Sequence, residues 1–278
     1  MTFFERLEQR AQQTGSRLCV GLDPDPRRIA GTDIAGFLRE IVAATRDVAC
    51  CYKPNLAFFE AFGEEGWSVL RRTLDGIPDY VPVIADAKRG DIGNTAEAYA
   101  RSLFERWNFD AATVNAYGGE DAVRPFLTYG DRGVYVWCRS SNPGAADFQD
   151  LPVADGDGGT RPLYEAVAER ARTWNELGNA ALVAGATYPA QIARLRVLCP
   201  ELPFLVPGVG AQGAELREAV QAAAMADGGG FVVNASRGVL YASTGADFAE
   251  AARREAVALR DAINKALEVR GSTFEVRR

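Results

Sequence analysis

The chain has 278 residues, 47% of them hydrophobic, and a formal net charge of −6 at pH 7. This length can bury a substantial core, and the acidic balance excludes the clustered basic surface that binds nucleic acid. The chain contains no histidine, which excludes histidine-based catalytic triads, HExxH zinc sites and histidine proton shuttles. If the protein is an enzyme, lysines and carboxylates must carry its proton transfers.

Membrane and disulfide-bonded classes are also excluded. No apolar run approaches the roughly 20 residues that cross a bilayer, and the N-terminus lacks the form of a secretory signal. The cysteines form no CxxC pair and lie mostly in apolar runs, at Cys19, Cys50, Cys51, Cys138 and Cys199. They are typical of reduced core residues rather than disulfides or zinc ligands. We therefore expect a cytoplasmic protein with no membrane partner.

Apolar strand-like runs alternate with amphipathic helical runs along the chain. After a leading helix at about 1–14, strands are predicted near 17–23, 49–55, 81–88, 111–116, 133–140, 180–186, 203–208 and 231–236. Helices are predicted at 33–47, 64–76, 94–107, 119–129, 162–177, 189–198, 211–226 and 247–268, and residues 269–278 as a frayed polar tail. Eight strands alternating with eight helices predict an α/β fold, a (β/α)8 TIM barrel forming a single domain over 1–278. A doubly wound open sheet is the alternative.

The stretch 85–95 places two carboxylates and an amine directly after an apolar strand. The strand period of two sends Asp86 and Lys88 to the same face. Two glycines then end the strand, and Asn94 or Thr95 is in position to cap the following helix. A salt-bridged strand end would explain any single Asp-x-Lys pair, but the spacing of the whole stretch indicates a site.

Polar side chains also end other predicted strands, at the face where barrel active sites lie. Lys53 follows an apolar run, and a buried lysine needs a carboxylate partner, which Asp86 or Asp91 could provide. Asp23 ends the first strand, where a turn-capping role is the alternative to a functional one. Asn115 ends the fourth strand, and we expect its amide to satisfy backbone groups.

The segments after the fifth, seventh and eighth strands are typical of lids and anion sites. Residues 141–161 are rich in Gly and Asp, which predicts a lid loop. Residues 206–213 carry three glycines before a helix, which suits backbone N–H groups that approach an anion. Gln212 adds a neutral donor there. Arg237 offers a planar fork suited to phosphate, with a surface ion pair as the alternative, and barrels frequently bind phosphate in these last two loops.

The spacing Asp86-x-Lys88-x-x-Asp91-Ile92-x-x-Thr95 resembles the signature of orotidine 5′-phosphate decarboxylase, in the longer bacterial sub-type. That family also has an upstream lysine, a Ser-Asn/His-Pro-Gly turn, a Pro-Gly-Val-Gly-Ala-Gln-Gly loop and a late Arg-Gly pair. All have counterparts here in the same order, over roughly residues 17 to 241. The resemblance implies decarboxylation of orotidine 5′-monophosphate to uridine 5′-monophosphate in pyrimidine biosynthesis, with no cofactor and no metal.

The resemblance also implies roles for individual residues. Lys53, Asp86, Lys88 and Asp91 form an alternating charge array, in which Lys88 stabilises and then protonates the carbanion. The implied substrate-binding residues are Asp23 for a ribose hydroxyl, Ser140 or its neighbour Ser141 for the pyrimidine edge, Gln212 and Arg237 for the phosphate, and Thr95. It further implies a homodimer in which Asp91 and Thr95 complete the site of the opposite subunit.

Two other functions share part of this pattern. An Mg²⁺-dependent sugar-phosphate decarboxylase of the same suprafamily, of the 3-keto-L-gulonate 6-phosphate type, shares Asp-x-Lys-x-x-Asp, but Ser140 and Thr95 favour the nucleotide. A non-catalytic barrel that binds nucleotide phosphate would keep Arg237 but has no need of Lys53 and Lys88.

Overall fold

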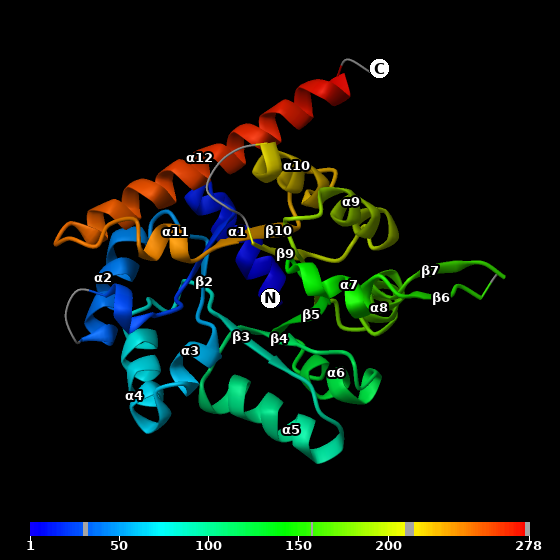
Figure 1. Ribbon diagram of the computed structural model, residues 1–278, viewed down its shortest axis with the longest axis horizontal. Helices are drawn as coiled ribbons and strands as arrows, with labels where there is room; N and C mark the ends of the chain where they lie inside the picture. The colour runs from blue at the N-terminus through cyan, green and yellow to red at the C-terminus, as the bar shows by residue number, and fades with distance from the viewer. Residues whose placement is uncertain (30–32, 157, 209–213, 276–278) are drawn as a thin grey trace.

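The computed structural model describes residues 1–29, 33–156, 158–208 and 214–275. Eight parallel strands form a nearly closed barrel with helices around its outside (Figure 1). The strand order is β2-β1-β10-β9-β8-β5-β4-β3, and isolated bridges, Tyr52 to Val83 and Asn55 to Asp86, join the two end strands. The predicted (β/α)8 TIM barrel is confirmed, and the open-sheet alternative is wrong.

Every predicted strand overlaps a barrel strand, and every predicted helix overlaps a helix. The barrel strands are β1 (Leu18–Gly21), β2 (Cys51–Lys53), β3 (Ile84–Arg89), β4 (Ala111–Val114), β5 (Gly133–Arg139), β8 (Ala180–Ala184), β9 (Phe204–Pro207) and β10 (Phe231–Ala235). The predicted helices are α1 (Phe3–Thr14), α2 (Ile34–Thr45), α4 (Gly63–Leu74), α5 (Gly93–Arg101), α6 (Glu120–Leu127), α8 (Leu163–Thr173), α9 (Pro189–Leu198), α10 (Ala214–Ala223) and α12 (Phe248–Glu275). A π-helical turn, Ser102–Arg106, extends α5, and the short helices α3 (Leu56–Glu60), α7 (Ala146–Gln149) and α11 (Arg237–Leu240) had not been predicted.

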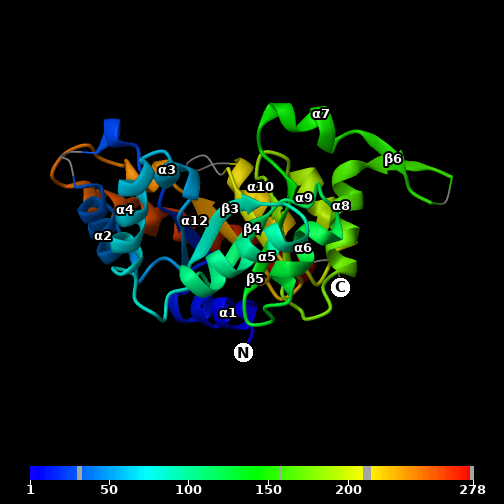
Figure 2. The same ribbon diagram turned by 90° about the horizontal axis from the view of Figure 1, so that it is seen from below.

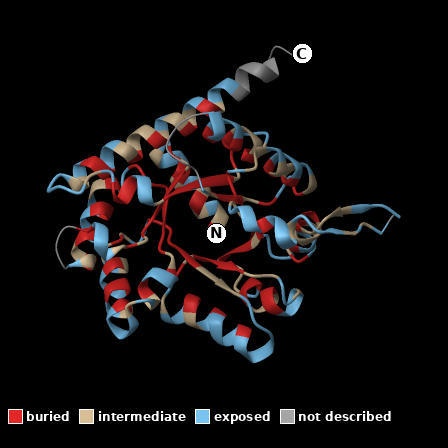
Figure 3. Cartoon of the chain, viewed as in Figure 1, coloured by how far each residue is buried: buried red, intermediate tan, exposed pale blue. Residues whose placement is uncertain are grey.

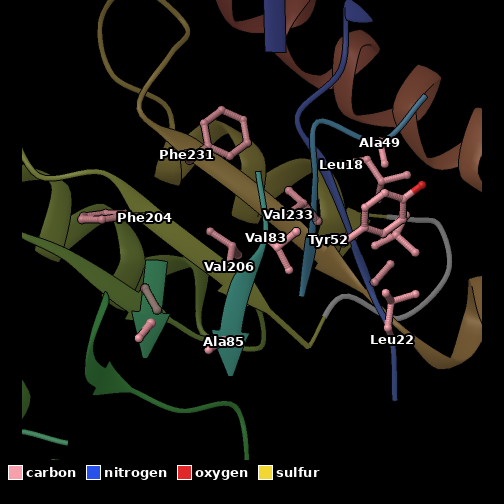
Figure 4. Packing of buried hydrophobic residues seen from close by; sticks show 14 of the residues in the cluster. Leu18, Leu22, Ala49, Tyr52, Val83, Ala85, Phe204, Val206, Phe231 and Val233 are labelled. Carbon is pink, nitrogen blue, oxygen red and sulfur yellow. The ribbon is translucent and has the colours of Figure 1, made fainter. Parts of the chain in front are cut away.

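Alternate residues of the strands face two separate layers of the core. Side chains such as Leu18, Val206 and Val233 point to the surrounding helices and form the outer layer (Figure 4). Their neighbours along the strands, such as Cys19 and Leu205, fill the barrel interior. Burial on both faces explains why these strands are continuous apolar runs (Figure 3).

The leading helix α1 closes the end of the barrel at which the strands begin. A capping box between Thr2 and Glu5 starts the helix, and its apolar face contributes Phe3 and Leu7 to the inner layer. Gly133 allows this contact, because a Cβ there would lie 2.3 Å from the Phe3 ring. Figure 2 shows α1 at the opposite end of the barrel from α3 and α7, so the carboxyl ends of the strands stay open for a site.

The predicted lid loop, 141–161, contains secondary structure. A 3₁₀ turn (Pro143–Ala145) leads into α7, and β6 (Pro152–Ala154) pairs antiparallel with β7 (Thr160–Pro162) in a hairpin that projects from the barrel (Figures 1 and 2). The glycines and aspartates that suggested a plain loop lie between these two short strands. Such residues are typical of the connection in a hairpin.

The C-terminal helix continues beyond its predicted end at residue 268. A frayed tail was expected from residue 269. This expectation is wrong for residues 269–275, because α12 continues to Glu275. No proline interrupts this segment, and its one glycine, Gly271, lowers helix propensity by only about 1 kcal/mol. Among the described helices, none has a stretch long and apolar enough to cross a bilayer.

Candidate active site

Lys53, Asp86 and Lys88 form an ion-pair network at the carboxyl ends of β2 and β3. Lys53 Nζ donates to Asp86 Oδ2 at 2.6 Å, and Lys88 Nζ donates to the other carboxylate oxygen, Oδ1. Lys53 is 3% exposed and Asp86 8%, whereas the Lys88 side chain is 34% exposed. Lys88 is therefore the member of the network that a bound molecule can reach.

Burial and ion pairing act in opposite directions on these groups. Burial raises the pKa of Asp86, but the ammonium groups of Lys53 and Lys88 outweigh it and lower this pKa to about 2. Burial likewise lowers the pKa of Lys53, yet the carboxylates of Asp86 and Asp23 raise it above its ordinary value. Asp86 and Lys53 are therefore both charged at neutral pH.

The backbone of β3 is irregular where it presents Lys88. Pairing between β3 and β4 shifts register between Ala85 and Arg89, and Lys88 has a φ of 46°. A residue with a Cβ in this left-handed region costs roughly 1–2 kcal/mol. The predicted period of two therefore does not account for the way Lys88 reaches Asp86, because a bulge turns the chain between them.

Asp91 and Thr95 lie apart from the network within one chain. Both are exposed, and Asp91 Oδ1 accepts a hydrogen bond from the backbone N–H of Ile92 at 2.8 Å. Among the described residues, Asp91 has no ion-pair partner. The predicted cap of α5 by Asn94 or Thr95 is wrong, because the helix begins earlier, at Gly93, with Ile92 in the cap position and no side-chain cap bond.

A cavity of about 670 Å³ opens between the ends of β1, β9 and β10. Asp23, Gly208 and Arg237 are among its lining residues. Asp23 Oδ1 accepts a hydrogen bond from Asn55 N at 3.1 Å. Arg237 is exposed at the start of α11, and its guanidinium makes no hydrogen bond or ion pair with any residue that the structure describes. The predicted phosphate ligand Gln212 lies outside the described residues.

The two serines after β5 have different neighbours. Gln149 of α7 donates through Nε2 to Ser140 Oγ at 3.0 Å, and Ser140 N donates to Gln149 Oε1 at 2.9 Å. Ser141 instead lies against Gly208, where a Cβ would be 2.9 Å from the Ser141 side chain. Ser140 is thus engaged by the segment predicted as a lid, and Ser141 borders the loop after β9.

Asn115 at the end of β4 satisfies the backbone, as expected. Its Oδ1 accepts a hydrogen bond from Tyr117 N at 3.0 Å. The polar groups at the carboxyl ends of these strands are thus of three kinds: the charge network, the Arg237 guanidinium in the neighbouring cavity, which has no partner among the described residues, and amides such as Asn115 that bind the backbone.

Comparison with known proteins places this arrangement in a family. The family described as Orotidine 5′-phosphate decarboxylase / HUMPS matches residues 16–254. Proteins named orotidine 5′-phosphate decarboxylase from Roseiflexus castenholzii and Thermomicrobium roseum are 53% and 50% identical to this chain, over 96% and 95% of its length and 99% and 96% of theirs. The chain belongs to the orotidine 5′-phosphate decarboxylase family.

Solved structures agree with this orotidine 5′-phosphate decarboxylase membership. An OMP decarboxylase from Leishmania donovani has a TM-score of 0.84 and 44% identity, covering 96% of this chain and 99% of that one. A putative orotidine-monophosphate-decarboxylase from Toxoplasma gondii has a TM-score of 0.89 and 38% identity, covering 98% of each chain. The predicted family is therefore confirmed over nearly the full length.

In this member of the orotidine 5′-phosphate decarboxylase family, three residues beside the site had no predicted role. Arg139 is 1% exposed, and its guanidinium binds Gln149 Oε1 at 2.9 Å, which holds α7 to the end of β5. Thr113 on β4 donates to Asp86. The only sequence signal for Arg139 was a charge in an apolar strand, and Thr113 and Gln149 carried none, because their roles depend on contacts between separate elements.

Proposed function

We propose that this protein decarboxylates orotidine 5′-monophosphate to uridine 5′-monophosphate in pyrimidine biosynthesis, in the cytoplasm, without a cofactor or a metal. The observation that carries the proposal is the buried carboxylate of Asp86 bound by two lysines, one of which, Lys88, has a partly exposed side chain. Family membership over residues 16–254 supports the same substrate.

In the proposed reaction, the bond between C6 of the pyrimidine and its carboxylate breaks, CO₂ leaves, and the electron pair stays on C6. No ring position can accept this charge, so a fixed positive charge must stabilise it. Lys88 supplies that charge and then transfers a proton from Nζ to C6. Asp86 holds the Lys88 ammonium and crowds the departing carboxylate, while Lys53 keeps Asp86 ionised.

The phosphate of the substrate would bind at the far side of the cavity. Arg237 lines the cavity there and its guanidinium has no partner among the described residues, and we propose Gln212, which follows Gly208 in the sequence, as a second phosphate ligand. We place the ribose beside Asp23 and the pyrimidine edge beside Ser140 or Ser141. The segment 141–161 would act as the lid, and the bond between Gln149 and Ser140 gives it direct contact with the site.

We further propose a homodimer that shares its sites. Ile92, between β3 and α5, and Tyr117, after β4, are 58% and 86% exposed in the single chain, and apolar side chains of this kind are typical of an interface. Asp91 precedes α5 and Thr95 lies in the first turn of that helix; both are exposed, and they would complete the charge array and the substrate contacts of the partner's site.

The alternative functions are less well supported. In a Mg²⁺-dependent sugar-phosphate decarboxylase, a carboxylate would be available to the cation, whereas both oxygens of Asp86 are bound by ammonium groups. A non-catalytic nucleotide-binding barrel would not need this charged network, which is costly to bury.

The direct test mixes the purified protein with orotidine 5′-monophosphate and follows the change in pyrimidine absorbance, with identification of uridine 5′-monophosphate by chromatography. We expect stoichiometric conversion. An unchanged substrate, in the presence of protein that binds uridine 5′-monophosphate, would favour the non-catalytic barrel.

A further inference from the structure

Thr113 connects the β3 bulge to the charge network. It lies on β4 and is 1% exposed. Its Oγ1 donates a hydrogen bond to Asp86 Oδ1 at 3.1 Å and accepts one from the N–H of Ala87 and one from the N–H of Lys88, each at 3.0 Å. A hydroxyl has one donor and two acceptor positions, so this side chain is fully used by three groups of the neighbouring strand.

These three bonds act on the part of β3 that leaves regular pairing. The register with β4 shifts between Ala85 and Arg89, and Lys88 adopts a φ of 46°. The hydroxyl of Thr113 binds the two consecutive amides inside this bulge, including that of Lys88 itself. Backbone in a rare conformation persists where its surroundings over-determine it, and Thr113 supplies that constraint.

The same hydroxyl also fixes the carboxylate that receives Lys88. It donates to Asp86 Oδ1, the oxygen that accepts the Lys88 ammonium. One side chain therefore sets both the backbone from which Lys88 projects and the oxygen on which its ammonium rests. The β-branched threonine is stiff about χ1, which suits it to hold these groups in one geometry.

We propose that Thr113 is a positioning residue for proton delivery by Lys88. This inference rests on the proposed decarboxylation. Thr113 would not touch the substrate itself. Its hydroxyl would keep the Lys88 Nζ at the place where the carbanion develops, so its loss would slow the chemical step and leave substrate binding nearly intact.

The test compares Thr113→Val, which replaces the hydroxyl by a methyl group of similar size, with Thr113→Ser, which keeps the hydroxyl. Thr73→Val is the matched control, because Thr73 is also buried and donates to Val69 O at 2.8 Å on the outer helix α4. For each protein, kcat and KM for orotidine 5′-monophosphate, the Kd of uridine 5′-monophosphate and the midpoint of urea unfolding are measured.

We expect Thr113→Val to lower kcat by about 10- to 100-fold, as small misplacements of reacting groups do, with KM and Kd within about threefold of wild type. Thr113→Ser should have a kcat within about threefold of the wild-type value. Thr73→Val should lose stability and keep kcat. A Thr113→Val enzyme with the wild-type kcat, or a Thr113→Ser enzyme as slow as it, would overturn the proposal.

A separate readout distinguishes this inference from the proposed function. If wild type does not decarboxylate the substrate, the proposed function fails, and amide hydrogen exchange then tests the positioning alone. The Lys88 amide should exchange faster in Thr113→Val than in wild type and Thr113→Ser. Equal protection in all three proteins would mean that the hydroxyl does not hold the bulge.

Discussion

Lys53 and Lys88 bind the two oxygens of a single carboxylate. Lys53 comes from β2, is buried, and donates to Asp86 Oδ2 at 2.6 Å, whereas Lys88 comes from the β3 bulge, is one-third exposed, and donates to Oδ1. Because the carboxylate is shared, its position and its ionisation depend on both lysines. The two amines nevertheless differ in access, since Lys53 is buried and Lys88 is partly exposed.

The low pKa of Asp86 predicts a specific loss of stability in acid. Its pKa falls from an ordinary 3.8 to about 2 in the folded protein. A lowered folded-state pKa gives stability that is present above the unfolded value near 4 and lost as the pH falls through the folded value near 2. We expect a contribution of about 2–3 kcal/mol to disappear between these two pH values.

Urea unfolding at pH values from 6 to 2 measures this effect, with Asp86→Asn as the comparison. The variant is less stable at neutral pH, because it leaves Lys53 buried without a charge partner. Its free energy of unfolding should nevertheless fall less steeply between pH 4 and 2 than that of wild type. Parallel curves for the two proteins would show that Asp86 does not titrate as the ion pairs require.

Activity should not depend on a divalent cation. Each Asp86 oxygen accepts an ammonium hydrogen, so the charge of this carboxylate is already neutralised by two cations and does not favour a metal. We expect turnover to stay within experimental error after dialysis against EDTA. Loss of activity with EDTA and recovery with Mg²⁺ would support the sugar-phosphate alternative.

Arg237→Ala should weaken phosphate binding and spare the chemistry. We expect KM for orotidine 5′-monophosphate to rise by at least tenfold, because a charge-assisted contact of this kind contributes roughly 1.5–3 kcal/mol. Turnover of orotidine, which lacks the phosphate, should hardly change. Steady-state kinetics on both substrates make the comparison internal.

Arg27→Ala is the matched control for this prediction. Arg27 is an exposed arginine that pairs with Asp25 near the same cavity, so its loss should leave both substrates unaffected. Equal losses on the two substrates in Arg237→Ala would instead assign Arg237 a structural role.

The shared-site homodimer predicts complementation between two inactive variants. Lys88→Ala and Asp91→Ala homodimers should each be nearly inactive, because every site lacks one group. After subunit exchange, random pairing makes about half of the dimers mixed, and each mixed dimer has one intact site. Activity should therefore recover to roughly a quarter of wild type. Tagging one variant shows that exchange has occurred, and an inactive mixture of confirmed heterodimers would place Asp91 in its own subunit's site.

The barrel was predictable because its signals are local. Eight apolar runs such as 133–140, and the helical periodicity between them, are visible along the chain. The same strand pattern places the lysines and carboxylates at the ends of strands. The left-handed turn at Lys88 was not predictable, since no glycine marks it. Thr113 and Gln149 act across strands and helices, so their contacts have no counterpart in sequence spacing. The hairpin in 141–161 was missed because its strands are short and none of their residues is buried.

Lys88→Ala tests whether Lys88 stabilises the carbanion and protonates C6. We expect kcat for orotidine 5′-monophosphate to fall by more than a thousandfold, because proton donor and counter-charge are lost together. Uridine 5′-monophosphate should still bind, and the loss of stability should be smaller than in Lys53→Ala, because Asp86 keeps its buried partner. A Lys88→Ala protein that retains a tenth of wild-type kcat would show that Lys88 is neither the proton donor nor the main counter-charge.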